Sequence, residues 1–344
     1  MAKNNTKPRA LVLYGKTTGI KQRTMKRIGK LYPKIYNMEN LILADEKAQK
    51  GKSKQYGVQI HNKNKDTNLL KLHEMLKDKT YSTSKYDIFK VYEPKEREVY
   101  RLPYFPDRIT HHAIMNVLEP LFVASFTADT YSCIKHRGIH ACVKKLKQAL
   151  TNKEETIYCL KLDITKFYPS INHGVLKNLL RRKFKDTNLL WLLDEIINSA
   201  PGLPIGNYLS QYLANFYLTY FDHWLKEEKK VKYYFRYADD LVILSDNKLY
   251  LHSLLHDIKQ YLNTHLKLLV KSNYQIFPVQ ARGIDFLGYR FYHTHILLRK
   301  RIKKNFARML KQNRNPASIA SYKGWTIHCN SKNLLKKLLK DEPV

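Results

Sequence analysis

Two runs of strand-forming residues flank a pair of adjacent acids in the second half of the chain. Residues 233–237 and 241–244 are mostly aromatic, Val, Ile or Leu, and the sequence Ala-Asp-Asp (238–240) separates them. Such residues favour strands, and a short polar break between two runs predicts a hairpin. A further apolar run, 157–162, predicts a strand that ends at Asp163. The pattern therefore places three carboxylates at strand ends.

Apolar residues recur at helical spacing in several other segments. Ile109, Ala113 and Val117, for example, fall on one face of a helix. The same reasoning predicts helices over 38–49, 69–79, 108–122, 208–218, 298–311 and 331–340, and alternation predicts a strand over 86–91.

Charge indicates the class of partner. The chain has 62 Lys and Arg against 29 Asp and Glu, a net charge of +33 over 344 residues. This balance favours a polyanion, with nucleic acid the first candidate. A membrane partner is not expected, because no apolar run approaches the ~20 residues that span a bilayer. No signal-peptide pattern precedes the basic start, so we expect a cytoplasmic protein.

Several features carry less chemistry. The four cysteines form no Cys-x-x-Cys pair, so neither zinc nor a disulfide framework is expected. His111 and His112 have no third ligand nearby in the sequence and are interpreted as structural. Residues 1–55 are rich in Lys and Arg and predict a basic N-terminal extension, either a solvated arm or a contact for RNA.

Asp163, Asp239 and Asp240 form a candidate metal site. Adjacent acids repel each other, and an acid at the end of a buried strand is costly unless it is paired or bound to metal. Carboxylate oxygens suit Mg²⁺, and two such ions serve in-line phosphoryl transfer. The alternative is a solvated Asp-Asp turn without a metal. The hairpin motif considered by itself favours this alternative.

Two further stretches suggest contacts with nucleotides. Arg97 and Arg101 can match phosphate oxygens, although ion pairs with neighbouring glutamates explain them equally well. Gly202 and Gly206 precede a predicted helix and would let the backbone approach a base pair closely, with Gln211 as a polar contact. The alternative is that the two glycines only form the turn that leads from the loop into the helix.

Four motifs follow one another between about residues 90 and 300, and their order is that of a known family. They are the strand-ending Asp163, Leu-Pro-Ile-Gly at 203–206, Tyr-Ala-Asp-Asp at 237–240 and Phe-Leu-Gly-Tyr at 286–289. This order resembles the palm motifs of reverse transcriptases. The resemblance implies an α+β fold: a right-hand polymerase with fingers, a palm whose antiparallel sheet carries the catalytic acids, and a helical thumb.

The implied activity is DNA synthesis from dNTPs on an RNA template. We expect the N-terminal extension at 1–55, fingers with the start of the palm at 56–160, the palm at 161–295 and the thumb at 296–344.

The resemblance also implies residue roles. Asp163, Asp239 and Asp240 would be catalytic and, with the backbone carbonyl of Ile164, would bind two Mg²⁺ ions, for which Mn²⁺ can substitute. Tyr168 would be the aromatic gate that collides with a ribose 2′-hydroxyl. The other implied nucleotide-binding residues are Arg97, Arg101, Ile205, Gly206 and Gln211.

Three more roles follow from the resemblance. Lys271 is the nearest candidate for a general acid, although its spacing departs from the common pattern. The primer grip is implied at Phe286, Leu287, Gly288 and Tyr289. The thumb residues expected to track phosphates are Arg299, Lys300, Arg301, Lys304 and Arg308.

One position departs from the commoner family pattern. Many reverse transcriptases carry Gln where this chain has Ile205, and its Ile-Gly-x-x-x-Ser-Gln sequence resembles the enzymes of diversity-generating retroelements. Those bacterial and phage enzymes copy a template RNA into cDNA with frequent errors at adenines, and they work with a small basic accessory protein. A lost hydrogen bond to the nucleotide weakens discrimination, so low fidelity is expected.

Three alternatives remain open. A stand-alone antiphage-defence reverse transcriptase has the same chemistry. An intron maturase is less favoured, because we find no splicing or nuclease segment in the sequence. A catalytically silent RNA-binding scaffold is a different class of protein, and the presence of all three acids argues against it.

Overall fold

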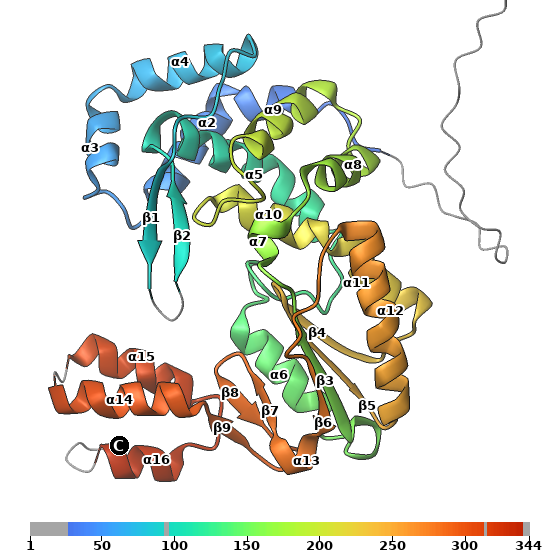
Figure 1. The fold of residues 1–344 in the computed structure, drawn as a ribbon. Helices are drawn as coiled ribbons and strands as arrows, with labels where there is room; N and C mark the ends of the chain where they lie inside the picture. The colour runs from blue at the N-terminus through green and yellow to red at the C-terminus, as the bar shows by residue number, and fades with distance from the viewer. Residues whose placement is uncertain (1–26, 93–95, 313–314, 340–344) are drawn as a thin grey trace, which may run out of the picture.

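The structure is a computed structural model of the chain. It describes residues 27–92, 96–312 and 315–339. Within these ranges, helices are combined with a two-, a four- and a three-stranded antiparallel sheet (Figure 1). This arrangement confirms the predicted α+β class.

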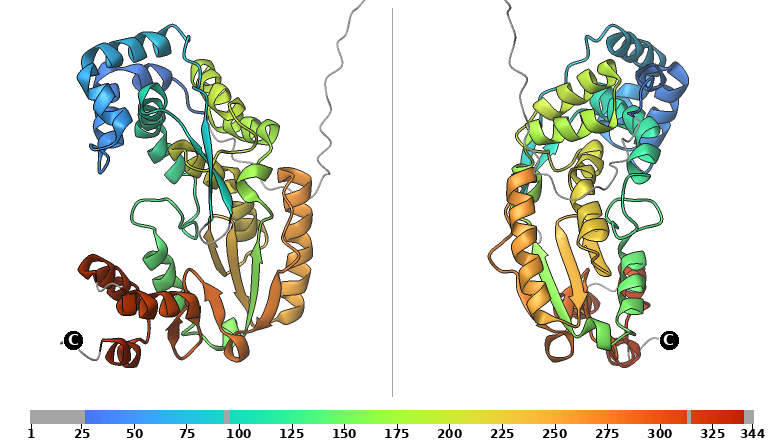
Figure 2. Two further views of the ribbon diagram at one scale, coloured as in Figure 1. Left: turned by 60° about the vertical axis from the view of Figure 1, so that its left-hand side comes forward. Right: turned by 90° about the vertical axis from the view of Figure 1, so that its right-hand side faces the viewer.

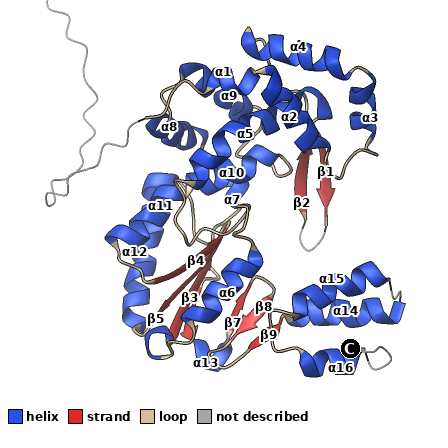
Figure 3. Ribbon diagram, turned by 180° about the vertical axis from the view of Figure 1, so that it is seen from behind, coloured by secondary structure: helices blue, strands red, loops and turns tan. Residues whose placement is uncertain are grey.

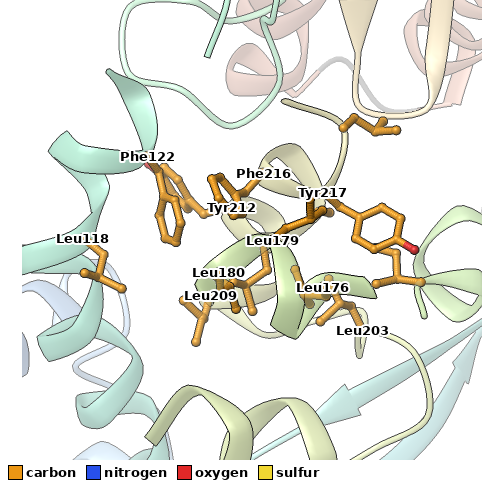
Figure 4. Packing of buried hydrophobic residues seen from close by; sticks show 14 of the residues in the cluster. Leu118, Phe122, Leu176, Leu179, Leu180, Leu203, Leu209, Tyr212, Phe216 and Tyr217 are labelled. Atoms are coloured by element: carbon orange, nitrogen blue, oxygen red, sulfur yellow. The ribbon is translucent and has the colours of Figure 1, made fainter. Parts of the chain in front are cut away.

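The upper part of the molecule in Figure 1 is helical and is built around α5. This helix contacts α1, α2 and α10. The rings of Phe122 on α5 and Phe216 on α10 lie 5.1 Å apart, and leucines of α8 complete the apolar cluster (Figure 4). Each fully buried Leu or Phe contributes roughly 1.5–3 kcal/mol. The helices are α1 Tyr32–Tyr36, α2 Met38–Gln49, α3 Tyr56–Lys63, α4 Lys65–Lys77, α5 Ile109–Val123, α8 His173–Lys183, α9 Thr187–Asn198 and α10 Tyr208–Tyr217.

A two-stranded hairpin extends from this helical part. It consists of β1 (Asp87–Val91) and β2 (Arg97–Arg101), paired from Asp87 opposite Arg101 to Val91 opposite Arg97. The backbone nitrogen of Tyr100 donates to the carbonyl of Ile205 over 2.8 Å. This bond fixes the hairpin against the loop that precedes α10.

The central sheet has the strand order β4-β5-β3-β6. On β5, Leu241 and Ile243 belong to the apolar cluster that includes α12, whereas Val242 and Leu244 belong to the cluster that includes α6. Figure 2 shows these two helices on opposite sides of the sheet. Burial of both faces explains why the strand is continuously apolar. The elements are α6 Ile139–Ala149, β3 Tyr158–Asp163, α7 Phe167–Ser170, α11 Thr219–His223, β4 Tyr233–Tyr237, β5 Asp240–Ser245, α12 Lys248–Leu266 and β6 Gln275–Pro278.

A second small sheet leads into the C-terminal helices. The strand order is β7-β8-β9, and α14, α15 and α16 follow beside it, as the view from behind also shows (Figure 3). Phe306 on α14 stacks on Tyr322 of α15 with ring centres 4.8 Å apart. The bounds are α13 Val279–Arg282, β7 Ile284–Phe286, β8 Tyr289–Phe291, β9 Ile296–Leu298, α14 Lys300–Gln312, α15 Pro316–Thr326 and α16 Lys332–Leu338.

The N-terminal extension differs from a solvated arm where the structure describes it. The predicted helix at 38–49 is confirmed as α2, but Leu41 and Ala44 of α2 and Ile35 of α1 are fully buried in the main core. Residues 1–26 lie outside the described residues.

The expected boundaries of the palm do not follow the strands. The boundary after residue 160 falls within β3. The boundary after residue 295 separates β9 from β8, although the two strands are paired. The division into fingers, palm and thumb stays a proposal. Along the described ranges, no helix combines the length and the apolar character that a membrane span requires.

Candidate active site

Antiparallel pairing brings the predicted acids together at one edge of the central sheet. Asp163, the last residue of β3, is the register partner of Asp240, the first residue of β5. The pairing of β4 with β5 leaves Ala238 and Asp239 as the turn between them. The backbone nitrogen of Ile164 donates to the carbonyl of Asp239 over 3.3 Å. The convergence expected from the strand ends is therefore present.

Burial and mutual repulsion raise the pKa values of two of the three acids. Burial, and then the hydrogen bond and charge of Asp163, raise the pKa of Asp239 to about 7. Burial raises the pKa of Asp240 to about 6, and the charge of Asp163 adds to this effect. The Oδ1 atoms of Asp163 and Asp240 are buried and have no hydrogen-bond partner. The site thus contains carboxylate oxygens that can accept hydrogen bonds and receive none.

The donor set fits a hard divalent cation. Mg²⁺ prefers carboxylate oxygens, and it commonly completes its shell with water and substrate phosphate. The Oδ1 atoms of Asp163 and Asp240 accept no hydrogen bond, although Lys161 Nζ lies 3.8 Å from that of Asp240. In the described part of the chain, no three His, Cys, Asp or Glu side chains are arranged so that they could hold a metal ion together, and this includes the three acids. Asp163, Asp239 and Asp240 have the right ligand chemistry, and their role as metal ligands stays a prediction.

Two lysines lie against the acids. The Nζ of Lys271 is 2.5 Å from Asp163 Oδ2, and its backbone nitrogen donates to the Asp163 carbonyl over 2.9 Å. The Nζ of Lys161 is 3.8 Å from Asp240 Oδ1 and also donates to the carbonyl of Asp285. Lys271, the predicted general acid, is thus in the site, where it serves as the counter-ion of Asp163. It would have to leave this carboxylate to donate a proton elsewhere.

A buried ion pair behind the hairpin is a feature that sequence reasoning missed. Arg236 and Asp222 are both fully buried, and the guanidinium binds the carboxylate through Nε at 2.8 Å and Nη2 at 2.5 Å. Its Nη1 donates to the carbonyl of Ala238 and to Asn215 Oδ1, each over 3.1 Å. The signal was present as an Arg inside an apolar strand, since a buried charge needs a buried partner.

Tyr168 lies on α7, five positions after Asp163. Burial, followed by the charges of Cys133 and Asp239, raises its pKa. Phe167 is 3% exposed and belongs to the core, whereas Tyr168 is half-buried. A gating role for Tyr168 stays a prediction.

The two hairpin arginines differ in their partners. Arg101 forms an ion pair with Asp87 and lies 5.5 Å from the ring of Phe89. Arg97 has no ion pair among the described residues, and its charge acts on the pKa of Tyr168. Contact of Arg97 with a triphosphate stays a prediction.

The glycines of the 202–207 loop are required by close backbone packing. A Cβ on Gly202 would lie 2.5 Å from the carbonyl oxygen of Tyr168, and one on Gly206 would lie 2.8 Å from that of Tyr100. Both have positive φ angles, +61° and +118°. The loop is held between the acid-bearing segment and the hairpin. Ile205, within this loop, is partly exposed, and Gln211 on α10 is exposed.

The predicted primer grip lies under the C-terminal helices. Phe286 and Tyr289 are fully buried, so their side chains are part of the core. Gly288 has a φ of +87°, and a Cβ there would lie 2.5 Å from Trp325 and 2.9 Å from Ile302. The structure thus gives this glycine a packing role, and contact with a primer stays a prediction.

The predicted thumb cations fall into two groups. Arg299 donates through Nε to Asp285 over 2.6 Å, so it is paired. The others lie on exposed positions of α14, opposite the buried Phe306; they are Lys300, Arg301, Lys304 and Arg308.

Residues 93–291 match the family model described as reverse transcriptase (RNA-dependent DNA polymerase), and this range is more than half of the chain. The chain belongs to this family. Membership confirms the predicted right-hand polymerase fold and the enzyme class, RNA-directed DNA polymerase. The matched range falls within the span over which the motifs carry the resemblance. Enzymes of this family generally use divalent metal ions, in agreement with the donor set at the sheet edge.

Relatives of this reverse transcriptase include bacterial and intron-encoded proteins. Protein YkfC of Escherichia coli is 24% identical over 299 residues, which covers 72% of this chain and 77% of YkfC. The group II intron-encoded protein LtrA of Lactococcus lactis is 25% identical over 173 residues, covering 46% of this chain and 28% of LtrA.

A solved structure, telomerase from Candida albicans in complex with a TWJ fragment of telomeric RNA, matches with a TM-score of 0.49 and 11% identity. The match covers 70% of this chain and 52% of the telomerase chain. This chain therefore spans about half the length of that telomerase, and less of LtrA.

Proposed function

We propose that this reverse transcriptase copies a template RNA into cDNA by two-metal phosphoryl transfer. The observation that carries the proposal is the pairing of Asp163 opposite Asp240, with Asp239 in the adjoining turn. A scaffold would have no need for buried, unsatisfied carboxylate oxygens, which cost free energy when no ligand is bound.

The chain's own residues would position the reactants around the acids. Two divalent ions, when bound, would activate the primer 3′-oxygen and neutralise the charge that develops on the leaving pyrophosphate. Arg97 would bind the triphosphate of the incoming nucleotide, because a guanidinium fork matches phosphate oxygens. Tyr168, on the α7 segment that follows Asp163, would exclude a ribose 2′-hydroxyl. Lys271 would release Asp163 when cations occupy the site.

We further propose that synthesis is error-prone and serves a diversity-generating retroelement. The support is the aliphatic Ile205 in place of a glutamine, followed by Gly206 and Gln211. An alkyl side chain offers the nucleotide no hydrogen bond. The difference in binding free energy between a matched and a mismatched nucleotide is therefore smaller than it would be with a glutamine at this position. The partners would be the template RNA, dNTPs and a small basic accessory protein.

A second candidate is an accurate enzyme of the intron-encoded or stand-alone defence kind. The identity with LtrA favours it. Its chemistry at Asp163, Asp239 and Asp240 would be the same, so the two candidates differ in their error spectrum and in the RNA with which the protein associates.

Primer extension on an RNA template with Mg²⁺ and four dNTPs tests these proposals. The wild type is compared with the double variant Asp239→Ala/Asp240→Ala, and the products are sequenced. We expect metal-dependent cDNA that the variant does not make, with errors concentrated opposite template adenines. Accurate cDNA would support the second candidate. No cDNA, even with the native RNA and partner present, would overturn the polymerase proposal in favour of the scaffold.

A further inference from the structure

Lys161 projects from the face of the central sheet that carries the small β7-β8-β9 sheet. Side chains of β3 alternate between the two faces, so Lys161 shares its face with Cys159 and Asp163. Cys159 belongs to the same apolar cluster as Val242, the register partner of Lys161, and as Phe286 of β7. Figures 1 and 3 show the small sheet between the central sheet and α14. Lys161 is therefore placed to contact the strands that lead into the C-terminal helices.

This lysine joins two parts of the molecule. Its Nζ lies 3.8 Å from Asp240 Oδ1 at the acid edge of the sheet, and it also donates to the backbone carbonyl of Asp285 on β7. Its neighbours along β3, Leu160 and Leu162, are buried. A charged group within an apolar strand is costly unless it has partners. The carboxylate and the carbonyl supply these partners, one on each side of the lysine.

Asp285 in turn binds the residue that precedes α14. Its Oδ1 accepts from Arg299 Nε over 2.6 Å, and Nη2 of Arg299 lies 2.5 Å from the same oxygen. The backbone nitrogen of Arg299 donates to the carbonyl of Gly288 over 2.9 Å. The carbonyl of Arg299 accepts from the backbone nitrogen of Lys303 over 3.1 Å, in the first turn of α14. A continuous series of contacts thus runs from the acid edge to α14.

The charges along this series act on one another. Burial is the largest influence on the pKa of Asp240 and raises it. The positive charge of Lys161 is the next largest and lowers it, and Arg299 acts in the same direction. The side chains of the two ion pairs are between 24% and 43% exposed, so solvent screens both pairs and each contributes little to stability. Their loss should therefore change the position of β7 and α14 more than the free energy of unfolding.

We propose that Lys161 is a positioning residue that fixes the C-terminal helices relative to the acids. It holds β7 beside Asp240, and β7 holds the start of α14 through Arg299. The exposed cations of α14 would then bind nucleic acid at a constant distance from the acid edge. This inference rests on the proposed function, because it assumes that the acids and α14 act on the same nucleic acid.

Hydrogen–deuterium exchange tests this connection without synthesis, metal or nucleic acid. Exchange in residues 284–291 and 299–312 of the full chain is followed by mass spectrometry in EDTA. Lys161→Met and Asp285→Asn each remove a different link of the series, and the second leaves the backbone carbonyl that Lys161 contacts. We expect each variant to speed exchange in both segments about tenfold, because the backbone hydrogen bonds of β7 and Arg299 would open more often. Exchange in α12 should not change.

Lys232→Met is the matched control. It removes the ion pair with Glu155 at the end of the central sheet away from the acids. Exchange in residues 284–291 and 299–312 should stay at the wild-type rate. We expect the melting temperature of every variant to fall by less than about 3 °C, because partly exposed ion pairs contribute little to stability.

The double variant Lys161→Met/Asp285→Asn shows whether the two residues act in one series. If they do, the first substitution already breaks the connection, and the double variant should exchange no faster than the faster single variant. Two independent contacts would instead multiply their effects on the exchange rate. Multiplied effects would overturn the inference, and so would wild-type exchange in both single variants.

Primer extension distinguishes positioning from simple neutralisation of Asp240. With a heparin trap, both single variants should make shorter products per binding event, while the rate for the first nucleotide at saturating Mg²⁺ and dNTPs stays within about threefold of the wild type. If Lys161 only neutralised Asp240, Lys161→Met would change the Mg²⁺ concentration for half-maximal rate and Asp285→Asn would have no effect. That result would overturn the inference, as would products of wild-type length from both variants.

The exchange measurement also separates this inference from the proposed function. Faster exchange in both variants of a protein that makes no cDNA would count against the polymerase proposal alone and leave the connection from Lys161 to α14 standing. Active synthesis with exchange unchanged in both variants would do the reverse.

Discussion

Arg236 joins the turn that carries Asp239 to α11, the helix that carries Asp222. Its guanidinium binds the buried Asp222 and also donates to the carbonyl of Ala238, whose φ of +55° is rare for a residue with a side chain. A left-handed Ala costs roughly 1–2 kcal/mol, so the turn needs contacts that hold it. The arrangement gives Arg236 two separable effects, one on stability and one on the position of Asp239.

Removal of this guanidinium should be severe. We expect Arg236→Met to lower the free energy of unfolding by about 3–5 kcal/mol, because Asp222 would stay buried without a partner. Urea denaturation measures this loss. Primer extension per folded molecule should also fall, because the Ala238 carbonyl loses its donor.

The double variant Arg236→Met/Asp222→Leu separates the two effects. An apolar pair of similar volume often restores stability when it replaces a buried ion pair. We expect it to recover only part of the stability, because the buried hydroxyls of Tyr234 and Thr130 also lose Asp222 as their acceptor, and to recover little of the extension rate. Full activity in the double variant would contradict a positioning role and leave Arg236 purely structural.

Ile205 offers a test of fidelity at one side chain. We expect Ile205→Gln to lower misincorporation about tenfold, because a new hydrogen bond would reward the correct nucleotide by ~1–3 kcal/mol. The backbone bond from Tyr100 to the Ile205 carbonyl involves no side-chain atom and should persist. The measurement is sequencing of cDNA from one defined template. Ile205→Leu is the matched control, and an error spectrum that is the same for all three proteins would contradict the hypothesis.

At the level of the elements, the C-terminal helices α14 and α15 pack against the turn between β7 and β8. Gly288 leaves space for Trp325 and Ile302, and the hydroxyl of Tyr289 donates to the Trp325 carbonyl over 2.9 Å. The backbone nitrogen of Arg299 donates to the Gly288 carbonyl over 2.9 Å. Any side chain on this glycine would push α14 and α15 away from the sheet.

Gly288→Ala should therefore loosen the C-terminal helices without touching the acids. A Cβ 2.5 Å from an indole ring cannot be accommodated in place, and the positive φ adds strain. We expect shorter products per binding event, measured by primer extension with a heparin trap, at a nearly unchanged rate for the first nucleotide. Gly324→Ala on α15 is the matched control, because its Cβ would meet nothing within 4 Å. Equal product lengths for the two variants would contradict this role of Gly288.

The elements differ in how well the sequence predicts them. The β4–β5 hairpin and β3 were predictable because Tyr, Val, Ile and Leu propensity agrees with their burial, and a polar turn ends each run. The burial of α1 was not predictable, because its five residues, Tyr32–Tyr36, are too few to show a helical period of apolar residues. The partner of Arg236 was also hidden, since Asp222 lies on another element and only the fold brings the two together.

The same distinction applies to the candidate site. The acids were predictable because strand ends in one sheet meet at one edge. The packing beneath Gly288 was not, because Trp325 lies 37 positions further along the chain and no local pattern links the two. Residue types at strand ends can be recognised from the sequence, whereas contacts between distant segments depend on the topology of the fold.

For the molecule as a whole, the net charge of +33 is the dominant property. A charge of this size draws in nucleic acid at any orientation, so affinity alone does not identify a binding face. The exposed Arg301, Lys304 and Arg308 share one side of α14, opposite the buried Phe306 and Leu310. A face that tracks phosphates should contribute through counterion release, which is measured by the dependence of affinity on salt.

We expect the triple variant Arg301→Gln/Lys304→Gln/Arg308→Gln to bind a primer–template duplex with a weaker salt dependence. Each lost phosphate contact removes about 0.9 from the slope of log K against log salt on B-DNA, so the slope should fall by about 2–3. Anisotropy titrations at several salt concentrations measure it. The matched control, Lys63→Gln/Lys71→Gln/Lys77→Gln, removes three exposed charges from α3 and α4. If both triples lower the slope equally, the duplex responds to total charge and α14 has no privileged contact. A fall confined to the α14 variant would assign the phosphate track to this helix.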